Sequence, residues 1–380
     1  MNEERMKTLV NIYLNRQSEI TDGETDTRSK WVAVSNCVKK WDIDADDFGK
    51  MFGDAMNKAA PLINTAKSSP VEGIRLLCKN ERTEDVRDAF RDLLARDGGD
   101  LNLRQEHVLA FVKKINDLLA ETVPDEWEVR QKVRTAVMYL ALIRPTDNFM
   151  YRAPEVSAFA GYTEFDEELG YDRSFRMHNY HRLCDDMLDY VRTREDLINK
   201  VNASLDDKGR QIKDKDLPHI DPTMHILVYD IIDSAYHFDF YEDKAAKKGV
   251  KSSTVQQRKH EKMKKRAALL EEREQCVDRF DEVKAERRAA KIPKLQGKKV
   301  AHRAFGKGEI AEQDGRYLTV VFPEVTKKFA LPGCIVNGFL DISGGQKIVD
   351  AVNRMEEVSK KYRDVENRLT SLDVQLQMLE

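Results

Sequence analysis

Cysteine is sparse in this sequence and long apolar runs are absent, and each shortage excludes a class of protein. The five cysteines are scattered, odd in number and never spaced as Cys-x-x-Cys, which argues against a zinc ribbon and favours reduced thiols. No apolar stretch approaches the roughly 20 residues that a membrane-spanning helix needs, and the first residues contain no hydrophobic signal core. We therefore expect a cytoplasmic protein with no membrane partner.

The sequence also lacks the motifs of several enzyme classes. No Gly-x-x-x-x-Gly-Lys-Ser/Thr loop is present, so a P-loop ATPase or GTPase motor is excluded. The sequence contains no His-Asp pair, no His-x-His-x-Asp-His motif and no PD…(D/E)xK arrangement of the sort restriction nucleases use. General acid–base chemistry needs carboxylates that converge in a cleft, and spacing alone does not show this. We expect no enzymatic activity, no catalytic residue and no cofactor.

One group of possible metal ligands stands out. His178, His181, Cys184 and Asp185 would share one face of a helix, as zinc ligands do. No second ligand pair at a recognisable spacing accompanies them. We therefore predict a structural or surface role and no metal site, and a cryptic metal-dependent nuclease is the alternative.

A second group combines histidines and aspartates between positions 219 and 237. The stretch Ile226–Ile232 is apolar and predicts a core helix from which Asp230 and Asp233 point outward. This interpretation is favoured over a nuclease or phosphohydrolase site. The group consists of His219, Asp221, His225, Asp230, Asp233 and His237.

Charge and apolar content predict a mainly α protein. Charged residues make up 34% of the chain and apolar residues 41%, with a net charge of −3, which indicates solvated helices around a substantial core. Residues 1–243 predict one helical domain, in which Val108, Phe111 and Ile115 recur at helical spacing. Thr83 is expected to cap a helix, and the aromatic-rich segment 149–171 to cross over the helices less regularly.

Residues 244–293 predict a long basic helix. Between Lys244 and Arg266 many lysines and arginines face a single acid, Glu261, so this stretch supplies the positive potential that the net charge lacks. Without aromatics or Gly-Arg spacing, it would contact a nucleic-acid backbone and not the bases. A solvated linker helix is the alternative. The nucleic-acid candidates are Lys251, Arg258, Lys259, Lys262, Lys265 and Arg266.

Residues 294–341 predict a small, strongly bent β-barrel. The run Lys299–Ile310 reads as a strand, a tight turn at Gly306–Gly308 and the start of a second strand. The runs Tyr317–Phe322 and Lys327–Leu331 predict two more short strands. A module of this kind is expected to bind a partner and not to catalyse a reaction.

Residues 342–380 predict a C-terminal coiled-coil helix. Ile348, Met355 and Tyr362 recur every seven residues, and Ala351 and Val358 belong to a second series three residues later. This seam could pair with the basic helix as an antiparallel hairpin, or it could form a homodimer through 346–380. The hairpin is slightly favoured, because the entropic cost of closing a loop grows slowly with its length.

Several short motifs in the helical domain carry a family resemblance. They are Pro70–Gly73, Val86–Leu94, Pro145 followed by Tyr151, and Asp221–Asp230. With these motifs, about half of the chain resembles a helical domain of bacterial restriction-type proteins that precedes a McrB-like AAA+ motor. The resemblance implies a link to phage defence, but the motor is absent because the P-loop is missing.

The predicted barrel carries a second resemblance. Its matching positions are Val300, His302, Phe305–Gly308, Ile310, Leu318–Phe322 and Lys327–Phe329. They are similar to the Tudor-like (SH3-like) domain at the C-terminus of UvrD-type repair helicases, and CarD-type transcription regulators carry a related opening pattern. In those families the domain contacts RNA polymerase or DNA. Here, in contrast, a predicted coiled coil follows the domain and no helicase motor precedes it. A spacer barrel with no partner is the alternative.

These features together predict a non-enzymatic bacterial adaptor. It would dock to a transcription or DNA-processing complex through the barrel and the basic helix. The alternative is an accessory subunit of a restriction or anti-phage system whose motor or nuclease is a separate protein. Lysines of the barrel would meet phosphates or an acidic protein surface, and its tyrosine would supply a rigid contact. The partner-binding candidates are His302, Arg303, Lys307, Tyr317, Lys327 and Lys328.

Overall fold

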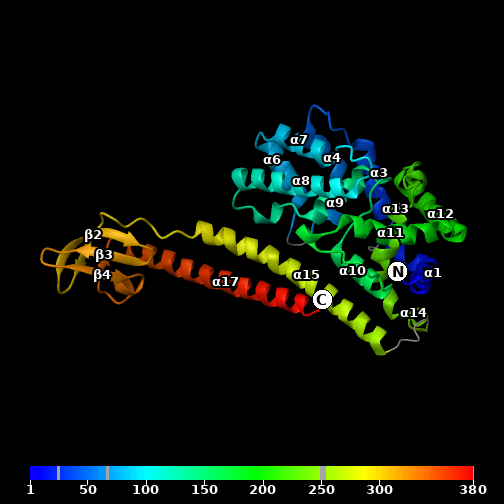
Figure 1. Cartoon of the computed structure of the whole chain (residues 1–380). Coiled ribbons are helices and arrows are strands. Elements are labelled where there is room, and N and C mark those ends of the chain that lie inside the picture. The colour runs from blue at the N-terminus through cyan, green and yellow to red at the C-terminus, as the bar shows by residue number, and fades with distance from the viewer. Residues whose placement is uncertain (24–25, 66–67, 249–253, 380) are drawn as a thin grey trace. The chain divides into compact units, whose positions relative to one another are not determined.

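The computed structural model describes residues 1–23, 26–65, 68–248 and 254–379. The chain divides into a helical unit, Met1–Gln275 with Leu372–Glu380, and a sheet unit, Cys276–Ser371. The described residues are mostly helical and include one small antiparallel sheet (Figure 1), which confirms the mainly α prediction. No helix within these residues is long and apolar enough to cross a membrane.

The helical unit is a succession of short and medium-length helices joined by brief loops. Short 3-10 turns lie at η2 (Trp127–Val129), η3 (Asp172–Ser174), η4 (Leu217–His219) and η5 (Phe240–Glu242). The α-helices are α1 (Glu3–Asn15), α2 (Gln17–Ile20), α3 (Ser29–Lys40), α4 (Phe48–Met56), α5 (Ala60–Ile63), α6 (Pro70–Lys79), α7 (Thr83–Leu93), α8 (Leu101–Thr122), α9 (Val133–Ile143), α10 (Ala153–Tyr162), α11 (Met177–Arg192), α12 (Glu195–Ile212), α13 (His225–His237) and α14 (Lys244–Lys248).

Aspartate side chains cap α4 and α8. Asp47 accepts a hydrogen bond from the backbone N–H of Lys50 at the start of α4. Asp100 accepts hydrogen bonds from the backbone N–H groups of Asn102 and Leu103 at the start of α8, and these N–H groups have no partner inside the helix.

The prediction for α7 was wrong in one respect. Thr83 is the first residue of α7 and not its cap, and its hydroxyl donates to the carbonyl of Cys78 at 3.3 Å.

The core of the helical unit contains a cluster of aromatic rings from α4, α7, α8 and α9. The Phe90 ring lies 4.9 Å from Phe111 and 5.4 Å from Tyr139, both edge to face. All three residues are fully buried, and each such ring pair adds about 0.5–1.5 kcal/mol beyond the burial of apolar area. The regular spacing of apolar residues in α8 therefore does predict the face that it buries.

The aromatic-rich segment 149–171 packs against α11 and α13. The Tyr151 ring lies 4.3 Å from Phe175 and 5.0 Å from Tyr180, and the Phe149 ring lies 4.1 Å from His225. The segment is more regular than the sequence suggests, because it contains the whole of α10.

The sheet unit is built on a five-stranded antiparallel sheet with the strand order β4-β3-β2-β1-β5. A bulge in β2 between Ile310 and Glu312 shifts the register against β3 and bends the strand. One face packs on a core that includes Val300, Ile310 and Val320, and Val352 from the helix that follows. The strands are β1 (Lys299–His302), β2 (Gly306–Asp314), β3 (Tyr317–Val321), β4 (Thr326–Ala330) and β5 (Asp341–Ile342).

The predicted turn at Gly306–Gly308 was misplaced. Both glycines belong to β2, where Gly306 pairs with His302 and Gly308 with Val300. The turn is formed by the residues between β1 and β2, so Lys307 is a strand residue. Glycine is still required, because Gly306 has a φ of +73° and a Cβ on Gly308 would lie 2.7 Å from the carbonyl oxygen of Val321.

Two long helices flank the sheet in sequence, α15 (Thr254–Ala289) and α17 (Gly345–Gln377), with the short α16 (Gly333–Val336) between them. Within the sheet unit they lie side by side (Figure 1), where Val283 packs against Val358 and Val365. The rings of Phe280 and Tyr362 lie 4.9 Å apart. Val358 and Val365 are seven residues apart and contact α15 of the same chain.

Candidate functional site

The partner-binding candidates of the sheet unit lie on both faces of its sheet. Residues paired directly across antiparallel strands share a face. Lys327 pairs with Val320 and therefore lies on the face that carries the core, whereas Lys328 pairs with Thr319 on the opposite face. Lys307 pairs with Ala301, also on the opposite face. The structure thus divides what the sequence presented as one surface.

His302 and Lys327 belong to an aromatic cluster at the rim of the core face. The His302 ring stacks on Phe305 at 4.5 Å and lies 5.5 Å from Phe329. The Lys327 ammonium lies 5.7 Å from the centre of the Phe305 ring, a cation–π distance. Both side chains are already in contact within the unit. The remaining candidate, Arg303, is exposed in the turn before β2.

The opposite face, which we call the outer face, exposes two large apolar side chains. Tyr317 and Val321 of β3 are 51% and 46% exposed, although β3 also carries the buried Leu318 and Val320. The Lys328 ammonium lies 5.1 Å from the Tyr317 ring. We define the outer face by Lys307, Tyr317, Val321 and Lys328. Sequence analysis missed Val321, which the alternation of β3 could have identified.

The basic run is described only in part. Lys251 lies outside the described residues, as do the side chains of Arg258 and Lys259. Within α15, Lys265 is exposed and Lys262 and Arg266 are half-buried. The structure thus describes the side chains of three of the six nucleic-acid candidates, and a common surface for all six stays a prediction.

The four possible metal ligands of α11, for which we predict a structural role, are split between core and solvent. His181 and Cys184 are buried, whereas His178 and Asp185 are exposed. Burial lowers the pKa of His181 to about 3 and raises the pKa of the Cys184 thiol. A neutral imidazole packed on Phe149 and an un-ionised thiol are typical of core side chains, so the structural interpretation is favoured.

Asp230 and Asp233 do not point outward, and the prediction for α13 was wrong here. They are 0% and 9% exposed and face Lys30 of α3, whose ammonium lies 2.8 Å from Asp230 Oδ1 and 2.6 Å from Asp233 Oδ2. Tyr13 and Thr27 donate hydrogen bonds to the other Asp230 oxygen, Oδ2. A buried carboxylate is tolerated only when it is paired and hydrogen-bonded in this way.

Protonation in this cluster follows from burial and pairing. Burial alone would lower the pKa of Lys30, but the two aspartates outweigh it and raise that pKa. Burial would likewise raise the pKa of Asp233, but Lys30 and His237 hold it below its usual value. For Asp230, burial dominates and raises the pKa. The ammonium of Lys30 and the carboxylates of Asp230 and Asp233 thus stabilise one another in the core, away from solvent.

The cluster extends to His237 and Glu155 of α10. His237 Nε2 lies 3.2 Å from Glu155 Oε1 and 3.4 Å from Asp233 Oδ1. Hydrogen bonds to these carboxylates raise the pKa of His237 to about 9, so the imidazole is protonated at neutral pH. Glu155, Asp233 and His237 are close enough to hold a metal ion. However, Lys30, Arg152 and the imidazolium already neutralise the carboxylates, so we assign no metal.

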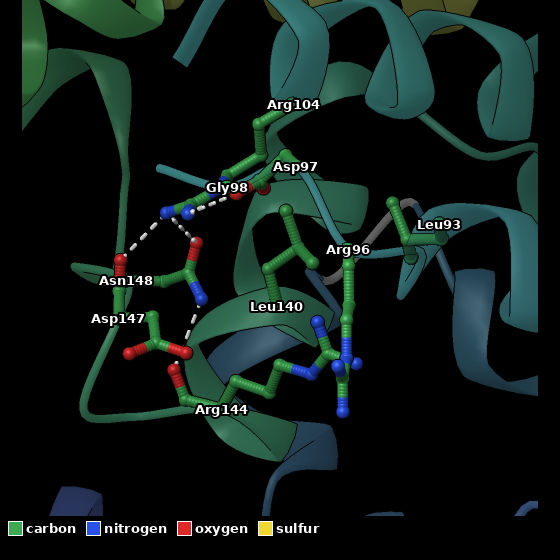
Figure 2. A pocket seen from close by; sticks show the side chains of 9 residues that line it. All are labelled: Leu93, Arg96, Asp97, Gly98, Arg104, Leu140, Arg144, Asp147 and Asn148. Carbon is green, nitrogen blue, oxygen red and sulfur yellow. Dashed lines mark hydrogen bonds and ion pairs between the residues drawn. The ribbon is translucent and has the colours of Figure 1, made fainter. Parts of the chain in front are cut away.

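A separate cavity of about 240 Å³ opens between the loop after α7, α8 and the loop after α9 (Figure 2). Arg104 forms one wall of the cavity, and each nitrogen of its guanidinium donates a hydrogen bond within the protein. Its Nε and Nη2 donate to the carboxylate of Asp97 at 2.6 and 3.0 Å, and its Nη1 donates to the Asp147 carbonyl and to Asn148 Oδ1. The hydrogen bond from Arg104 lowers the pKa of Asp97 to about 2.

Two further arginines line the same cavity. Arg96 comes from the loop after α7 and Arg144 directly follows α9, and Figure 2 shows both side chains reaching toward the same end of the cavity. In the described part of the chain, neither guanidinium has a hydrogen-bond or ion-pair partner. No motif predicts this pair, because the two residues are far apart in sequence.

Comparison with protein-family models, curated proteins and solved structures finds no match to this chain. We therefore infer its function from the geometry described above.

Proposed function

We propose that the protein is a non-enzymatic adaptor that binds a protein of a transcription or DNA-processing complex through the outer face of the sheet unit. The observation that carries this proposal is the exposure of Tyr317 and Val321 on one strand, with Lys328 held over the tyrosine ring. A rigid aromatic residue with a cation over its ring, on the same strand face as an exposed aliphatic residue, is the composition of an interface centre.

The proposal takes the sheet as an SH3- or Tudor-like barrel. The bulge in β2 supports this, because bulges bend strands toward closure. It also takes α15 and α17 as an antiparallel coiled coil within one chain. The packing of Val283 against Val358 and Val365 supports the pairing.

In this account the basic residues of α15 serve a second contact. Lys265 is exposed on α15 and would meet phosphates of nucleic acid. Such a contact carries no base specificity and weakens steeply as salt concentration rises. It would add affinity to the complex without choosing the partner.

The test is affinity purification of the intact chain from native cells, with and without nuclease treatment, followed by mass spectrometry. We expect RNA polymerase or a DNA-processing enzyme to co-purify after nuclease treatment. With the double variant Tyr317→Ala and Lys328→Glu, the amount of co-purified partner should fall at least tenfold. This is the effect expected from removing an interface hot spot.

Lys347→Glu is the matched control, because Lys347 is exposed at the start of α17 and lies outside the outer face. The amount of partner that co-purifies with Lys347→Glu should equal the amount that co-purifies with the unchanged chain. Partners that vanish with nuclease, or that survive in the double variant, would contradict a protein contact at the outer face. Recovery of a restriction motor or nuclease would favour the defence-system alternative.

A further inference from the structure

The cavity of the helical unit contains more positive charge than its own side chains neutralise. Arg104 is fully paired with Asp97 and with groups of the loop after α9. Arg96 and Arg144 line the same cavity, and within the described ranges neither guanidinium has a partner. Among the lining residues Arg96, Arg104 and Arg144 carry three positive charges, and Asp97 and Asp147 carry two negative ones. A net positive potential therefore remains in the cavity and attracts an anion.

The donors are of the kind that bind oxyanions. A guanidinium presents planar N–H groups whose spacing fits two oxygens of a phosphate or carboxylate. Arg104 and Asn148, anchored by their own hydrogen bonds, keep the wall between the two loops in place. The cavity is therefore formed before a ligand arrives, which reduces the ordering cost of binding.

The charge and the volume of the cavity limit the kinds of ligand that it can bind. A phosphate monoester carries a charge close to −2 at neutral pH, whereas a diester carries a charge of −1. The monoester therefore gains more from the two unpaired arginines, whose charge Asp147 offsets only in part. A volume of about 240 Å³ lies below the range of about 300–1,000 Å³ typical of drug-sized ligands. The buried Leu93 and Leu140 line the same cavity and offer an apolar wall.

We propose that the cavity lined by Arg96, Arg144 and Leu140 is a binding site for a small phosphate monoester, held through its phosphate by both arginines. Asp147 lines the same cavity and is not ion-paired with Arg144. Its carboxylate repels an incoming anion. Removal of that negative charge should therefore tighten binding.

The experiment is calorimetric titration of the full chain with inorganic phosphate and with glycerol 3-phosphate, at constant ionic strength. Both probes should bind at one site. Arg96→Gln and Arg144→Gln should each weaken binding about tenfold or more, the effect of losing a charge-assisted hydrogen bond. Asp147→Asn should tighten it several-fold. Arg173→Gln, which removes an exposed arginine outside the cavity, should leave it unchanged.

Binding that is equally strong in Arg96→Gln would overturn the proposal, and this exposed position can be changed without disturbing the core. Absence of binding to either probe would overturn it as well. A further titration uses an unphosphorylated thymidine oligonucleotide. If it displaces phosphate, the site recognises a nucleic-acid backbone and the assignment to a small monoester is wrong.

Discussion

Single residues in the helical unit show where buried charge is tolerated and why. Lys30 is 4% exposed, yet it lies within hydrogen-bond distance of two aspartates of α13. Removing the lysine would leave two carboxylates in the core with one cation fewer. Such a loss costs more than the pair itself contributes, because the remaining charges cannot be solvated.

Replacing Lys30 by Met tests this directly. We expect the free energy of unfolding to fall by about 3–5 kcal/mol, as for other buried ion pairs that lose one partner. Denaturant unfolding of the full chain, followed by circular dichroism, measures the change. The control is Lys39→Met, because Lys39 is partly exposed and pairs with Asp214 and Asp216 at the surface. That change should cost less than about 1 kcal/mol, and equal costs for both would contradict the account.

His237 predicts a pH dependence of stability. Its pKa is raised from the ordinary 6.5 to about 9, first by the hydrogen bond to Asp233 and then by the one to Glu155. The protonated imidazole therefore stabilises the fold fully below about pH 6.5, and this contribution is lost as the pH rises through about 9. Lys30 and Arg152 stay charged over this range because their pKa values are raised.

The measurement is the melting temperature of the unchanged chain and of His237→Gln as a function of pH. The difference between them should be largest below about pH 6.5 and should disappear above about pH 9. A difference that is constant across this range would show that the imidazole contributes by packing alone.

At the residue scale, sequence reasoning found the core faces but not the charge pairs. The spacing of Val108, Phe111 and Ile115 identifies a buried stripe, because helical periodicity is local. Asp230 instead depends on Lys30, which lies 200 positions away, and no local pattern encodes that contact. Arg96 and Arg144 were missed for the same reason, since two separate loops place them at one cavity.

At the scale of elements, the strands of the sheet unit could be predicted and their junctions could not. Alternation of apolar and polar residues identifies β3, because one face of the sheet covers a core. The pair Gly306 and Gly308 resembles a turn in sequence. In the structure, glycine is required at these positions for two other reasons. Gly306 has a positive φ at the start of β2, and the Phe322 ring lies too close to Gly308 for a Cβ atom.

Gly308→Ala tests whether the close approach of Phe322 requires glycine at position 308. The added Cβ would lie 2.6 Å from the Phe322 ring and 2.7 Å from the carbonyl oxygen of Val321, so the strands must separate. We expect the sheet unit to lose about 1–3 kcal/mol, the usual cost of overpacking, as measured by limited proteolysis of the full chain. Gly333→Ala is the matched control, because its nearest atom lies at 3.8 Å. Equal protease resistance of the two variants would refute the close approach.

At the scale of the whole molecule, the two units differ in the kind of side chain that is available for binding. The helical unit offers charged groups, and the sheet unit offers exposed apolar ones. The helical unit buries an ion cluster at Lys30 and keeps an unneutralised pair of arginines at its cavity. The sheet unit instead exposes Tyr317 and Val321. These observations are the basis on which we propose a protein contact on the sheet unit and a small-ligand contact on the helical unit. A homodimer through 346–380 stays a prediction.

The measurement that tests the central claim most directly is photo-crosslinking in cells, with a photoreactive amino acid placed at Val321. Val321 lies on the outer face and is 46% exposed, so a bound protein should be captured there. We predict one protein adduct that persists after nuclease treatment and is absent when the label replaces Glu357, an exposed residue of α17. An adduct at both positions, or at neither, would contradict a specific protein contact at the outer face.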